Sequence, residues 1–229
     1  MTPLHSKVNA RRSGAAIILR DTKAMTSAAF KDALPFILRW EGGYVNNPKD
    51  PGGATNKGVT QKVYDGWRRQ QGLAVRDVRE LTDDELEALY ESGYWLPPRC
   101  NLLATPLDLV QFDTAVNMGA GRAVRFLQQA VGATPDGSFG PGTQQCVANC
   151  DTGAALVAYC DAREAYYRGL PERNPNLAVF LKGWLNRLNS LRKQVGLPGY
   201  EAASDEVDYG EVGYMARVPD IEDPSFEPR

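Results

Sequence analysis

Apolar positions recur along most of this chain at the three- and four-residue spacing of amphipathic helices. The first such stretch ends at Glu41, and Gly42 and Gly43 follow it as a helix stop signal. A later stretch begins with Thr82 three positions before Glu85, which is the arrangement of a capping box. These signals predict separate helices with defined ends.

The same periodicity predicts further helices, whereas strand patterning is almost absent. The predicted helices lie in residues 26–41, 60–72, 81–95, 105–132 with a break at "NMGAG", 152–170 and 176–196. The loop from Tyr44 to Thr60 is rich in turn residues, and we expect it to fold back as a short irregular hairpin. The pattern therefore predicts a mainly α fold.

Charge and hydropathy exclude several classes of partner. The formal net charge is −2, but the segment from Glu201 holds nine acids against two arginines, and residues 1–200 hold 24 basic and 19 acidic groups. This mildly basic body lacks the dense Lys/Arg footprint of a nucleic-acid binder. No stretch approaches the roughly 18 to 20 apolar residues that cross a bilayer, and "AAIIL" is too short for a signal-peptide core. We therefore expect neither a nucleic-acid partner nor stable membrane insertion.

The histidine and cysteine content limits the kinds of catalytic and metal-binding site that the chain can form. His5 is the single histidine, so the chain cannot supply a HExxH zinc site, and any Ser-His-Asp or Cys-His catalysis would have to use that residue. Cys100, Cys146, Cys150 and Cys160 lack paired CxxC spacing, and they fit either free thiols or disulfides formed after export. We expect no metal and no cofactor, which leaves carboxylate chemistry.

The stretch "RWEGGYVNNPKDPGGATNKGVT" brings two acids into one turn-rich segment. Hydrolysis of a glycosidic bond typically uses a protonated carboxyl group and an ionised one. Glu41 follows Trp40 at a helix C-terminus, which favours the neutral acid, and Asp50 lies among glycines and hydrogen-bond donors, which favour the carboxylate. Thr55 is placed to orient a water molecule. The alternative is a solvated helix end followed by a turn.

This stretch resembles the signature of the glycoside hydrolase family 108 muramidases, phage and bacterial enzymes with a lysozyme-like helical fold that cut peptidoglycan. The resemblance implies that Glu41 is the catalytic acid, that Asp50 is the acid of the DPGG motif, and that Thr55 takes the place of a threonine found in related phage lysozymes. Residues 107–195, with "QFDTAVNMGAGRAVRFLQQAVG" and "DGSFGPGT", are similar to the peptidoglycan-binding region that accompanies this segment.

These resemblances predict a lysozyme-like helical domain with a short irregular β-hairpin after the first helix. Residues 1–24 are expected to be a disordered extension, and residues 25–110 the muramidase catalytic region. Residues 111–198 would be a helical peptidoglycan-binding region that completes the fold, and residues 199–229 a flexible acidic tail.

Five further side chains are candidates for binding the sugar polymer, because aromatic faces stack on pyranose rings and Asn or Asp side chains bind hydroxyl and acetamido groups. They are Tyr44, Tyr94, Trp95, Asp113 and Asn117. Packing in the core is the alternative for Tyr94 and Trp95, whereas Asp113 and Asn117 share one helix face.

The expected function is that of a monomeric, cofactor-free endolysin whose partner is bacterial peptidoglycan and whose target is the β-1,4 bond between N-acetylmuramic acid and N-acetylglucosamine. One alternative is a lytic transglycosylase that uses Glu41 alone, and another is a non-catalytic wall-binding or virion structural protein. The resemblance to phage enzymes implies synthesis in the host cytoplasm without a signal peptide and action on the wall, in the periplasm, after release through a holin.

Overall fold

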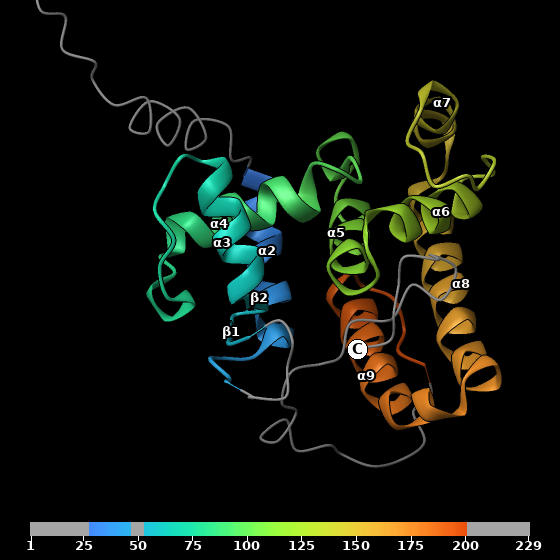
Figure 1. The fold of residues 1–229 in the computed structure, drawn as a ribbon. Coiled ribbons are helices and arrows are strands. Elements are labelled where there is room, and N and C mark those ends of the chain that lie inside the picture. Colours follow the sequence, from blue (N-terminus) through green and yellow to red (C-terminus); the bar gives the residue numbers. More distant parts are fainter. Residues whose placement is uncertain (1–27, 47–52, 201–229) are drawn as a thin grey trace, which may run out of the picture.

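A computed structural model describes residues 28–46 and 53–200 of the 229-residue chain. Within these residues the protein is mainly helical, which confirms the predicted fold class (Figure 1). The α-helices are α2 (Ala28–Glu41), α3 (Gln61–Gln70), α4 (Asp83–Tyr90), α5 (Leu107–Met118), α6 (Ala120–Ala130), α7 (Pro141–Asn149), α8 (Thr152–Arg173) and α9 (Ala178–Gln194). Short helical turns of other types lie at Val78–Glu80 (η1), Glu91–Trp95 (η2, a π-helix), Cys100–Leu102 (η3) and Pro175–Leu177 (η4).

Several helix ends follow directly from local sequence. Thr82 and Glu85 form the predicted capping box at the start of α4, and the side chain of Thr60 caps α3. Gly42 follows α2 with a φ of 69°, a conformation that favours glycine. Pro35 lies inside α2, and the helix nevertheless continues to Glu41.

The predicted hairpin is also present, immediately after α2. Strand β1 (Thr55–Asn56) pairs antiparallel with β2 (Val59–Thr60), and Val45 forms an additional bridge with Thr55. The two turn residues, Lys57 and Gly58, have φ values of 47° and 76°. A two-residue turn with two positive φ values matches the right-handed twist of a hairpin.

Helix α5 lies at the centre of the molecule. Each of its residues is buried, and it packs against α2 on one side and against α6 and α8 on the other (Figure 1). A helix that is buried on every side needs partners all around it. One continuous hydrophobic core therefore joins the elements before α5 to the helices after it.

Two of the predictions concern the ends of the chain. The expected N-terminal extension, residues 1–24, lies outside the described residues, as does the acidic tail beyond Tyr200. Tyr200 itself contacts α9, because its hydroxyl accepts a hydrogen bond from Arg192 at 2.8 Å and its backbone N–H donates to Asn189. Among the described residues, no helix has the length and apolarity to cross a membrane.

Candidate active site

Glu41 is the last residue of α2, and its side chain is only 6% exposed. Arg187 of α9 donates from Nη1 to Glu41 Oε1 at 2.8 Å and forms an ion pair with it. Sequence reasoning considered only the neighbouring Trp40 and the helix end. The structure adds a buried guanidinium from a distant helix, which contacts the carboxylate.

The hairpin turn packs directly on this carboxylate. A Cβ atom added at Gly58 would lie 2.6 Å from Glu41 Oε2 and 2.6 Å from the hydroxyl oxygen of Tyr90. That tyrosine also fixes the turn, because its hydroxyl donates to the carbonyl of Lys57 at 2.9 Å. Glycine at position 58 therefore lets the turn approach Glu41 closely.

Behind Glu41, buried charges continue across the core. Arg187 Nε donates to Asp113 Oδ1 at 2.8 Å, and Arg163 Nη1 lies 2.7 Å from Asp113 Oδ2. Burial alone would raise the pKa of Asp113, but the charges of the two arginines outweigh burial and lower that pKa. Burial likewise opposes the charge of Arg187, and Asp113 together with Glu41 raises its pKa above the ordinary value. The negative charges of Glu41 and Asp113 thus offset the positive charges of Arg163 and Arg187.

Asn117 lies at the far end of this network. Tyr167 accepts hydrogen bonds from Nε and Nη2 of Arg163 at 3.0 and 2.9 Å, and it donates to Asn117 Oδ1 at 2.7 Å. Among the described residues, Asn117 Nδ2 and Arg187 Nη2 are buried without a hydrogen-bond partner. Asp113 and Asn117 therefore do share a helix face, as predicted, but that face points into the core and not onto an open surface.

The other predicted residues are distributed around the hairpin and the core. Thr55 is buried and joins Val45 through two backbone hydrogen bonds of 2.8 Å, and its Oγ1 has no hydrogen-bond partner among the described residues. Tyr44 is 41% exposed, with Arg79 stacked over its ring. Asp50 lies outside the described residues.

Tyr94 and Trp95 belong to the aromatic packing around α5. Trp95 is 1% exposed, and its ring packs edge-on against Phe30 and Phe112 with centroid distances of 5.6 and 5.3 Å. Tyr94 is half-buried beside Tyr90. In this arrangement Trp95 presents no face to solvent, which favours the core-packing alternative for that residue.

Sequence reasoning missed Arg187 and Arg163. Arg187 carried a signal, because it interrupts the apolar stripe of α9 between Trp184 and Leu188, and all three side chains are buried. A charged residue on a buried stripe requires a buried partner.

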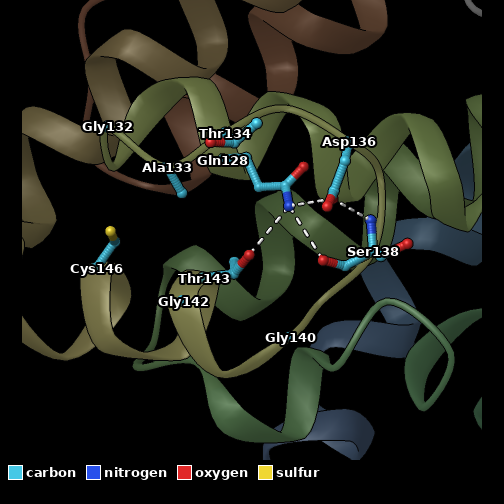
Figure 2. Close-up of a pocket in the computed structure, with 10 residues that line it drawn as sticks. All are labelled: Gln128, Gly132, Ala133, Thr134, Asp136, Ser138, Gly140, Gly142, Thr143 and Cys146. Carbon is cyan, nitrogen blue, oxygen red and sulfur yellow. Dashed lines mark hydrogen bonds between the residues drawn. The ribbon is translucent and has the colours of Figure 1, made fainter.

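A separate pocket of about 330 Å³ lies between the loop after α6 and the start of α7 (Figure 2). Gln128 is buried beside it and donates from Nε2 to Asp136 Oδ1, Ser138 O and Thr143 Oγ1, while Gly137 N donates to Gln128 Oε1. Asp136 also accepts from Ser138 N, as a turn residue does. The pocket walls are thus held by one amide side chain.

No group of three His, Cys, Asp or Glu side chains within residues 28–46 and 53–200 is arranged to hold a metal ion. All four cysteines in this part of the chain are free thiols, with Cys100 and Cys160 buried.

Two family models match the chain. The Glycosyl hydrolase 108 model matches residues 34–119, which include Glu41, and the Predicted Peptidoglycan domain model matches residues 122–189, which include Arg187. The solved structure of SagA from Brucella abortus is similar, with a TM-score of 0.60 and 34% identity over 72% of this chain and 92% of that one. No curated protein matches the chain. With this coverage and identity, the chain belongs to the glycosyl hydrolase 108 family and is a glycoside hydrolase that acts on peptidoglycan.

Proposed function

We propose that the protein is an N-acetylmuramidase that hydrolyses the β-1,4 bond between N-acetylmuramic acid and N-acetylglucosamine, with Glu41 as the general acid. The observation that carries this proposal is the position of Glu41, which is held at a helix end between the hairpin turn and a buried arginine. A general acid must be fixed within hydrogen-bond reach of the leaving oxygen. Oε1 of Glu41 accepts a hydrogen bond from Arg187, whereas Oε2 faces the turn at Gly58. We propose Oε2 as the atom that carries the proton.

Asp50 and Thr55 are proposed as the partners of Glu41 on the opposite side of the scissile bond. Val45 and Thr55 join the two ends of the segment that contains Asp50, next to the turn that contacts Glu41. This closure supports Asp50 as the base or electrostatic stabiliser. The unpartnered hydroxyl of Thr55 supports a role in orienting a water molecule. Tyr44, exposed near the same bridge, is the aromatic residue that we propose for stacking on a sugar ring.

The test is digestion of purified peptidoglycan, followed by mass spectrometry of the soluble fragments. The wild-type protein is expected to release fragments with reducing N-acetylmuramic acid ends. Glu41→Gln should keep the fold and lose about 10² to 10⁴ in rate, because it removes the proton donor. Glu80→Gln, which changes an exposed glutamate, is the control and should act like wild type.

The same experiment separates the alternatives. Fragments with anhydro ends would assign a transglycosylase, and bound peptidoglycan without fragments would indicate a protein that only binds. Release at the wild-type rate by Glu41→Gln, with folding verified by circular dichroism, would remove Glu41 from the mechanism.

A further inference from the structure

The partner of Glu41 comes from the other matched region of the chain. Glu41 and Arg187 are 146 positions apart in sequence, and their 2.8 Å contact joins the end of α2 to α9. Glu41 lies in the region matched by the hydrolase model and Arg187 in the region matched by the peptidoglycan model. The two regions therefore meet at the carboxyl group on which the proposed chemistry depends.

We infer that Arg187 is a positioning residue for Glu41, and that Asp113 and Arg163 hold Arg187 in place. The peptidoglycan region would then complete the active site in addition to binding the polymer. This inference rests on the proposed function of Glu41 as the general acid.

The geometry of Arg187 suits this task. A guanidinium is planar and presents its N–H groups in a fixed fork, so two acceptors on different helices define its orientation. Here Nη1 contacts Glu41 and Nε contacts Asp113, both at 2.8 Å. The second oxygen of Asp113 is held by Arg163, which is fully buried. The orientation of the Glu41 carboxylate is thus tied to three helices, α5, α8 and α9.

Stability alone does not account for this arrangement. Desolvation of buried charges is costly, and replacing a buried ion network with apolar side chains is often neutral or stabilising. Fixing the acid has a direct kinetic benefit, because a misplacement of about 1 Å can cost about 10²-fold in rate. Arg187 also stabilises the negative charge that Glu41 acquires when it gives up its proton.

The experiment compares Arg187→Met and Arg187→Lys with Arg192→Met in the full-length protein. Arg192 is the matched control, because it lies on the same helix, is also buried, and pairs with Asp161 at 2.9 Å. Arg187→Met should lower kcat by about 10²-fold with little change in KM, because the acid loses its alignment. Arg187→Lys should recover part of kcat, and added guanidinium ion should partly rescue Arg187→Met.

The control variant should lose thermal stability but keep the wild-type kcat. Equal losses of kcat in Arg187→Met and Arg192→Met, without rescue of Arg187→Met by guanidinium ion, would overturn the inference and assign Arg187 a structural role. If Arg187→Met fails to fold, a wild-type kcat in Arg187→Lys would overturn it as well. Failure of the proposed function is a different result, because Glu41→Gln would then keep its activity whatever the Arg187 variants show.

Discussion

Gly58 is the position at which the structure makes the sharpest prediction. Its φ of 76° lies in the left-handed region, and a Cβ atom there would meet Glu41 Oε2 and Tyr90 Oη at 2.6 Å and Glu41 Cβ at 3.0 Å. Gly58→Ala therefore adds one methyl group directly against the proposed acid. The carboxylate end is flexible and can move, but in moving it leaves its place beside the turn.

The size of the effect follows from these contacts. An ordinary carbon–oxygen contact is about 3.5 Å, so Glu41 Oε2 or the turn must shift by about 1 Å to accept the methyl group. A shift of this size can cost about 10²-fold in rate. The left-handed backbone adds about 1 to 2 kcal/mol of strain. Gly58→Ala should thus keep a folded protein, lose modest stability and lose most of its activity.

Gly72→Ala separates the two contributions. Gly72 has a φ of 70°, and a Cβ there would meet no atom within 4 Å, so the substitution carries the backbone strain without the clash. Gly72→Ala should lower the urea midpoint through backbone strain alone, and Gly58→Ala should lower it by at least as much, whereas Gly58→Ala alone should release peptidoglycan fragments about 10²-fold more slowly. Equal activity of the two variants would refute the argument that the turn packs against a working carboxylate.

Three further predictions concern the pocket, the buried acid and the thiols. Gln128→Ala should lower the unfolding free energy by about 2 to 3 kcal/mol in urea titrations, because several buried hydrogen bonds are lost together, whereas its exposed neighbour variant Gln129→Ala should be neutral. The pKa of Asp113 lies below its ordinary value of 3.8, so its stabilising charge is present above that pH and is lost as pH falls through the lowered pKa. Asp113→Asn should therefore destabilise the protein by about 3 kcal/mol at pH 7, with the difference shrinking toward pH 2 in the same titrations. Burial raises the pKa of Cys160 to about 11, so mass spectrometry after alkylation at pH 8 should find Cys146 modified in the native protein and Cys160 only after unfolding.

Local signals in the sequence are enough to predict most of the helices and the hairpin. The capping box of Thr82 and Glu85, and the glycine after Glu41, act within one turn of helix, and each is found at its predicted position. The hairpin follows from turn residues with a similarly short range. Such features depend on neighbours in the chain, so a single sequence is sufficient to identify them.

The partner of Glu41 could not be predicted in the same way. Periodicity shows which face of a helix is buried, but it does not show which residue of another helix meets that face. Glu41 and Arg187 are brought together only when α2, α5 and α9 pack, and the contact spans most of the described chain. Sequence reasoning considered the neighbour in sequence, Trp40, whereas Arg187 is a neighbour in space.

The type of partner that Asp113 needs could nevertheless be predicted from the burial of charged residues. Asp113 lies on a helix whose residues are all buried, and a buried carboxylate needs a cation or several donors. Arg163 and Arg187 are the arginines that meet it, and each lies on a buried face of its own helix. Pairing acids on buried faces with arginines on buried faces therefore limits the possible partners of Asp113, but it does not single out α8 and α9, because Arg68 and Arg122 are also buried. It does not select Glu41 as the second acid, because a glutamate at a helix end is equally well placed to face solvent until the hairpin turn closes over it.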